Sequence, residues 1–129
     1  MRKIFFLLLF SLAACSAPAE RDPATAPTPT IDLASDAGKG MMVFQANCAT
    51  CHALAEDVVI VGPSLAHIAT TAGNRVEGLA AEDYLRESIV NPNAYTVEGF
   101  AEGAMQQNFA TQLTSDDVTH VIAFLMTLE

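Results

Sequence analysis

The clearest pattern in the chain is a set of hydrophobic positions that recur at the spacing of an α-helix. Between Thr114 or Ser115 and Leu128 these positions are Val118, Val121, Ile122 and Leu125. Asp117 is placed to complete a capping box at the start of this predicted helix. A second helix is predicted over Ala81–Val90, with acidic residues in its first turn and a proline soon after its end.

Two further helical segments are predicted earlier in the chain. The first begins at Ser35 or Asp36, either of which can cap free backbone N–H groups, and runs to about Asn47. A shorter one is predicted around Leu65–Thr70. No segment alternates as a strand does, so the predicted fold class is all-α, with one helical domain over residues 36–129. Helices this short form a weak core, and domains of this size often rely on a covalent link, a metal or a cofactor.

The N-terminal region has the features of an export signal. Two basic residues precede an apolar run from Ile4 to Leu12, which is about half of the ~20 residues that a membrane-spanning helix needs. Residues 1–14 are therefore predicted to be a signal peptide, with a short buried helix as the alternative. The run ends in Ala13-Ala14-Cys15, which resembles a bacterial lipobox and predicts lipidation of Cys15. The alternative is an ordinary signal peptidase site that happens to contain a cysteine.

Composition extends this picture to the rest of the N-terminal region. Residues 15–35 contain four of the six prolines and almost no large apolar side chains, which favours an extended linker between a lipid anchor and the folded domain. The whole chain has a net charge of −9. Such a surface repels nucleic acid and favours partner proteins with basic docking patches. We expect an exported protein, anchored by lipid in the bacterial cell envelope, with its folded domain on the periplasmic or external side.

The main chemical motif is Cys48-Ala49-Thr50-Cys51-His52, the attachment pattern for c-type haem. Two cysteines three residues apart lie on one side of a helical turn, where both sulfurs can bond the vinyl groups of one porphyrin. The adjacent histidine can then ligate the iron. A redox-active dithiol and half of a zinc site are the alternatives. The first favours a βαβ context, and the second needs further ligands, for which only two other histidines exist.

These residues resemble the class I cytochromes c, and the resemblance covers nearly all of residues 36–129. The family spaces a glycine, an aromatic residue and the first haem cysteine four apart, as in Gly40, Phe44 and Cys48. It packs that glycine against an aromatic side chain on the last helix, for which Phe124 is the match. Gly62-Pro63-Ser64-Leu65 is similar to the family's Gly-Pro-X-Leu turn. The resemblance implies a small helical domain wrapped around one covalent haem c and its iron. It also implies that the carbonyl of Pro63 accepts a hydrogen bond from His52.

In that family the second axial ligand is usually a methionine on the loop before the last helix. Met105 lies in such a loop, whereas Met41 and Met42 precede the cysteines and Met126 falls in the last predicted helix. His52 and Met105 are therefore the expected iron ligands. The family often places proline after this methionine, and Gln106 stands there instead, which predicts a freer loop and a more labile iron–sulfur bond.

Several other polar residues are weaker candidates. His67 is expected near the His52 side of the haem, at the surface or the haem edge, and His120 is expected to be solvated near acidic residues of the last helix. Arg75 and Tyr84 are candidates for hydrogen bonds to haem propionates.

We therefore expect an electron carrier rather than an enzyme, passing single electrons between membrane-associated respiratory or photosynthetic partners. Two alternatives stay open. The domain could be a fixed haem subunit of a larger membrane oxidoreductase complex. If Met105 does not bind, the open iron could respond to a gas or to peroxide.

Overall fold

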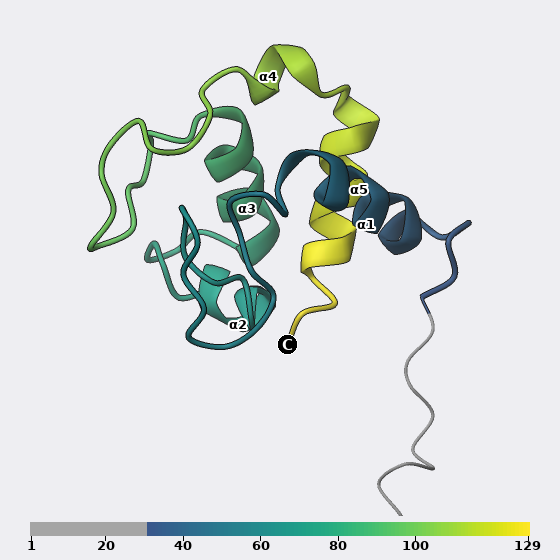
Figure 1. The fold of residues 1–129 in the computed structure, drawn as a ribbon, viewed down its shortest axis with the longest axis horizontal. Coiled ribbons are helices and arrows are strands. Elements are labelled where there is room, and N and C mark those ends of the chain that lie inside the picture. Colours follow the sequence, from purple (N-terminus) through teal and green to yellow (C-terminus); the bar gives the residue numbers. More distant parts are fainter. Residues whose placement is uncertain (1–30) are drawn as a thin grey trace, which may run out of the picture.

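The computed structural model describes residues 31–129, which form five helices and no strand. In order, the helices are α1 (Asp36–Asn47), α2 (Ile68–Ala72), α3 (Ala81–Val90), α4 (Phe109–Gln112) and α5 (Ser115–Leu125). Figure 1 shows α1 and α5 crossing on one side of the molecule, α2 and α3 on the other, and α4 between them at the top. The all-α prediction is confirmed. Within residues 31–129, no helix combines the length and apolarity needed to span a bilayer.

The predicted signal peptide (residues 1–14), Cys15 and most of the predicted linker lie outside the described residues. The last part of that linker, residues 31–35, packs against the folded domain. Ile31 contacts the core, and the backbone N–H of Ser35 donates to the carbonyl of Asp32 over 3.0 Å. The folded region therefore begins slightly before the helix at Asp36.

The two long N- and C-terminal helices start where their capping residues predict. Ser35 Oγ accepts from the backbone N–H of Gly38 at 3.0 Å, which fixes the start of α1. In α5, Thr114 Oγ1 accepts from the Asp117 N–H at 3.1 Å, and the Asp117 carboxylate accepts from the Thr114 N–H at 3.0 Å. The Thr114 hydroxyl also donates to the Asp117 carboxylate at 2.7 Å, and this bond, together with the one from the Thr114 backbone, lowers the pKa of Asp117 because both favour its charged form. Both reciprocal bonds of the predicted capping box are present.

The packing of α1 against α5 organises the core. A side chain added at Gly40 would place its Cβ 1.8 Å from the carbonyl oxygen of His120, so only glycine permits this close approach. One turn further on, the rings of Phe44 and Phe124 meet with centroids 5.4 Å apart and planes tilted by 50°. The buried residues of α3 and α5 complete the core together with Ile68, Ala72 and Phe109.

Two helix boundaries differ from those predicted. The short helix α2 begins at Ile68 rather than near Leu65, because His67 adopts a left-handed conformation (φ 55°) that a continuous helix excludes. Helix α5 ends at Leu125 rather than Leu128. Beyond it the chain turns, and the carbonyl of Leu128 accepts from the Ala69 N–H at 3.1 Å. The four-residue α4 was not predicted from the sequence pattern.

Candidate functional site

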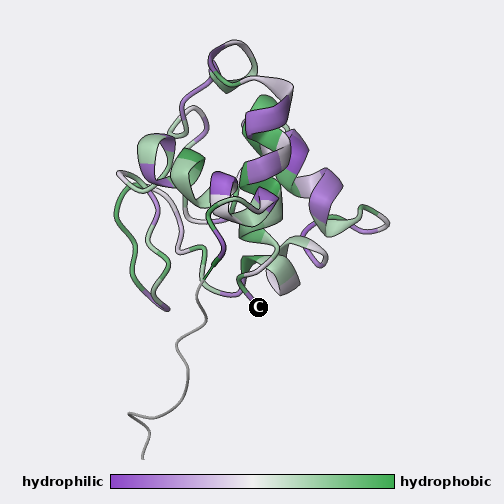
Figure 2. Ribbon diagram, turned by 90° about the vertical axis from the view of Figure 1, so that its right-hand side faces the viewer, coloured by the Kyte–Doolittle hydropathy of each residue, from purple (hydrophilic) through white to green (hydrophobic). Residues whose placement is uncertain are grey.

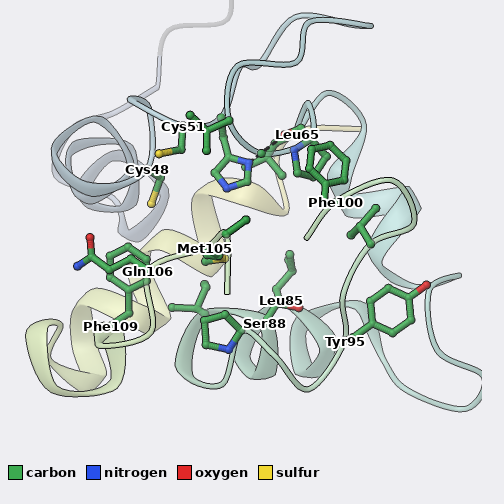
Figure 3. Close-up of a pocket in the computed structure, with 18 of the residues that line it drawn as sticks. Cys48, Cys51, Leu65, Leu85, Ser88, Tyr95, Phe100, Met105, Gln106 and Phe109 are labelled. Carbon is green, nitrogen blue, oxygen red and sulfur yellow. Dashed lines mark hydrogen bonds between the residues drawn. The ribbon is translucent and has the colours of Figure 1, made fainter. Parts of the chain in front are cut away.

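The two cysteines lie in a single tight turn at the end of α1. The backbone N–H of Cys48 still donates to Phe44 at 2.8 Å, and the N–H groups of Cys51 and His52 both donate to the Cys48 carbonyl at 3.0 Å. Both cysteine side chains are half-buried, and no disulfide joins them. Figure 3 shows Cys48 and Cys51 close together at one edge of a pocket, so both sulfurs are available to one ligand edge.

The environment of Cys48 does not suit a redox-active dithiol. Burial, and secondarily the neighbouring Cys51, raises the pKa of the Cys48 thiol to about 11. Reactive cysteines of dithiol enzymes have the opposite shift, toward the thiolate. The βαβ context of such enzymes is also missing from residues 31–129, where the only strand-like pairing is an isolated bridge between His52 and Val59.

The imidazole of His52 is fixed by the turn that follows it in sequence. Its Nδ1 lies 2.9 Å from the carbonyl oxygen of Pro63, which is the contact that the family resemblance implies. Because a carbonyl can only accept, Nδ1 carries the proton and the lone pair of Nε2 remains free to bind a metal. Gly62 makes room for the ring, since a Cβ at this position would lie 2.4 Å from His52 Cε1.

Met105 reaches the same pocket from the loop between α3 and α4. It is half-buried against the core and is the one methionine of residues 31–129 that lines the pocket (Figure 3). Met42 is half-exposed on α1, whereas Met41 and Met126 pack elsewhere on the core. The structure therefore brings His52 and Met105 to one cavity from two separate segments.

Hydrogen bonds restrain the Met105 loop, although the sequence predicts a freer loop. The Gln106 amide donates to the Gln112 side chain at 2.5 Å, and the Gln112 amide donates to Asn47 Oδ1 at 2.9 Å. Asn47 immediately precedes the first haem-motif cysteine. This chain of side-chain amides links the methionine loop to the end of α1, and it could not be recognised from the sequence because its members lie far apart.

The pocket suits a large, mostly apolar ligand with an anionic edge. It contains about 1280 Å³ of empty space, a figure that includes its open mouth, and most of its lining residues are apolar. Arg75 is the only Lys or Arg among the lining residues, and its Nε is buried with no hydrogen-bond partner. A buried unpaired donor is costly unless a ligand supplies an acceptor, as a haem propionate would. Tyr84 lines the same pocket. These features fit a haem.

The remaining histidines lie outside this pocket. His67 is half-exposed and hydrogen-bonds Glu56, which raises the pKa of His67. The side chain of His120 is 22% exposed and lies 3.5 Å from the Asp36 carboxylate of α1, so it is less solvated than the sequence predicts. Among residues 31–129, no three His, Cys, Asp or Glu side chains are grouped so that they could hold a metal ion.

Comparison with known proteins agrees with this geometry. The family model described as cytochrome c matches residues 37–129. None of the curated protein sequences compared with this chain matches it. The family match covers well over half of the chain and includes the Cys-X-X-Cys-His turn, the histidine-supporting turn and the methionine loop. The chain therefore belongs to the cytochrome c family, and its helical domain binds covalent haem c and transfers electrons.

Proposed function

We propose that this protein is a mobile single-electron carrier between membrane-associated respiratory or photosynthetic proteins, with His52 and Met105 as the two axial ligands of its haem iron. The observation that carries the proposal is the placement of these two side chains in one cavity. The hydrogen bond from Nδ1 to Pro63 leaves His52 Nε2 free. Two occupied axial positions favour electron transfer, because no site remains open for a substrate.

The haem supplies a reversible one-electron couple, taking one electron from a reduced donor and giving one to an oxidised acceptor. The chain contributes the surroundings of that couple. Apolar lining residues such as Leu65, Leu85 and Phe109 would keep water from a bound haem, and the Cys48 and Cys51 sulfurs would hold it covalently. Arg75 is positioned to neutralise an anionic edge.

The proposed location rests on the N-terminal sequence. A signal peptide over residues 1–14 would export the chain, and lipid on Cys15 would anchor it in the bacterial cell envelope with the haem domain on the periplasmic or external side. The proline-rich composition of residues 15–35 suits a linker that lets the domain move between partners. Mass spectrometry of the membrane-extracted protein tests this, because it shows either a chain that begins at a lipid-modified Cys15 or a different terminus.

Substitution of Met105 tests the ligand assignment. In the haem-loaded protein, Met105→Ala is expected to open the sixth position, so that the reduced form binds carbon monoxide. Met42→Ala, which removes a half-exposed methionine outside the cavity, serves as the matched control. Carbon monoxide binding is followed by the visible spectrum. If Met105→Ala binds no more carbon monoxide than Met42→Ala does, Met105 is not the ligand.

Extraction in mild detergent tests mobility. A carrier is expected to separate from other membrane proteins during gel filtration, because it visits its partners only briefly. Persistent co-migration with the same membrane proteins at fixed stoichiometry would contradict a mobile carrier and would indicate a fixed subunit of an oxidoreductase complex.

A further inference from the structure

The loop between α1 and α2 exposes an unusual run of hydrophobic side chains. All eight residues from Leu54 to Val61 are exposed, and they include four consecutive β-branched residues, Val58-Val59-Ile60-Val61. Figure 2 shows this loop as a largely hydrophobic segment with a hydrophilic tip, projecting from the helices. Val59 is 62% exposed and Ile60 52%. None of these side chains belongs to the core, although Leu54 and Ile60 line a smaller hollow beside Met41.

The run is connected directly to the haem-binding turn. The backbone N–H groups of Val61 and Gly62 both donate to the Cys51 carbonyl, at 3.2 and 2.9 Å, and Val59 forms a bridge with His52. Val61 also lines the haem cavity, so a bound haem would cover part of it. We therefore define the apolar patch as Leu54, Val58, Val59 and Ile60. A protein seated on this patch would lie beside the thioether edge of the haem.

Acidic side chains flank the patch and the adjacent cavity. Glu56 and Asp57 form the tip of the same loop, and both are exposed. Across the cavity, the loop that carries Met105 contains two more exposed carboxylates, Glu98 and Glu102. Residues 31–129 contain only three Lys and Arg residues, none of them on either loop. These carboxylates therefore complement a partner surface whose apolar centre is bordered by lysine or arginine.

The size of the patch indicates a brief contact rather than a stable one. The four half-exposed side chains offer an area on the order of 300 Å², the size of a functional patch on a monomer. A stable dimer buries about 800 Å² per partner, whereas transient redox pairs bury less than about 600 Å² each. The patch with its acidic border falls in the second range.

We propose that the apolar patch of the α1–α2 loop is the surface on which a redox partner docks, and that this partner has an apolar face bordered by basic residues. The inference rests on the proposed electron-carrier function and adds the place where the exchange occurs. One electron passes between the haem and the partner's own redox centre, and no bond forms or breaks.

Electron exchange with membranes from the cells that make the protein tests this surface. The full chain with its haem is reduced, mixed with detergent-solubilised membranes, and its oxidation is followed optically. Val59→Asn is expected to slow this reaction on the order of fivefold, because docking buries part of a half-exposed valine. Val90→Asn makes the same change at an exposed valine on α3, outside the cavity lining, and is expected to react as the unmodified protein does.

A small oxidant, tris(phenanthroline)cobalt(III), needs no docking surface. Its rate of reaction with each variant therefore shows whether the haem itself still transfers electrons normally. Val58→Asn repeats the test if Val59→Asn alters the haem spectrum, since Val58 forms no bridge with His52. Asp57→Asn removes a border charge while keeping a side chain that tolerates the left-handed backbone at this position (φ 58°). It is expected to weaken the dependence of the membrane reaction on ionic strength.

The possible outcomes separate this inference from the proposed function. If the membranes oxidise the unmodified protein and the Val58 and Val59 variants equally fast, the docking surface is wrong and the carrier function stands. If the membranes exchange no electrons even with the unmodified protein, while the cobalt complex does, the carrier function fails and the docking surface fails with it. If phosphatidylcholine vesicles protect the amides of residues 54–60 from hydrogen exchange in the unmodified protein but not in Val59→Asn, and the membrane reaction of Val59→Asn is unchanged, the patch contacts lipid, and the proposal is overturned.

Discussion

Replacing Gly62 by alanine should disturb the histidine side of the haem pocket, because the added methyl group meets the His52 ring. The new Cβ would lie 2.4 Å from His52 Cε1 and 2.8 Å from Nδ1. Ordinary contact begins at 3.4 Å, so the ring or the Gly62 backbone must move by about 1 Å. The bond from Nδ1 to Pro63 is 2.9 Å long, and a retreat of this size would stretch it beyond hydrogen-bonding range.

The energetic cost has two parts. Overpacking a well-filled site costs about 1–3 kcal/mol, and a lost hydrogen bond costs about 0.5–1.5 kcal/mol, so Gly62→Ala should lower the free energy of unfolding by about 2–4 kcal/mol. With His52 as the proposed iron ligand, the lost hydrogen bond would also weaken the electron donation of the imidazole to iron, and weaker donation favours the ferrous form. The midpoint potential should therefore rise.

Guanidinium unfolding and redox titration of the haem-loaded protein measure both effects. Gly73→Ala is the matched control, because its added Cβ meets nothing closer than 3.8 Å and the backbone there is helical (φ −66°). The control should stay within about 0.5 kcal/mol of the unmodified protein. Equal stability and equal potential for the two variants would refute the assignment of Gly62 as the residue that makes room for the His52 ring.

Three further changes test other parts of the structure. Gly40→Ala should lower the free energy of unfolding by at least about 3 kcal/mol, because its Cβ would lie 1.8 Å from the His120 carbonyl and push α1 away from α5. A stability equal to that of Gly73→Ala would contradict this. Gln112→Ala breaks the amide chain to the Met105 loop and should raise carbon monoxide binding by the reduced protein about two- to threefold. The control Gln45→Ala, at an exposed position of α1, should not. The hydrogen bond to Glu56, and secondarily one to the backbone of Glu129, raises the pKa of His67 above 6.5, so these contacts stabilise the fold below pH 6.5 and lose this contribution as pH rises through the raised value. Unfolding curves against pH should show the loss, and Glu56→Gln should make it smaller.

The features that could be predicted from the sequence are those that depend on local pattern. Capping residues locate the starts of α1 and α5, and the apolar period with acidic first-turn residues locates α3, because these signals lie within a few positions of each other. The end of α5 was predicted three residues too late, since its apolar period continues through residues that leave the helix. There the Leu128 carbonyl bonds α2, a contact between segments far apart in the chain.

The same distinction applies to the site. The haem attachment turn is a contiguous string, so residue spacing alone indicates its chemistry. The residues that restrain the Met105 loop are not contiguous in sequence. Gln106 and Gln112 are six residues apart, and Asn47 lies 65 residues from Gln112. Each glutamine, considered singly, is an unremarkable exposed side chain, and the missing proline after Met105 predicted a looser loop. Long-range hydrogen bonds between exposed amides leave no periodic signal, so the restraint on the methionine side becomes visible only when the chain is folded.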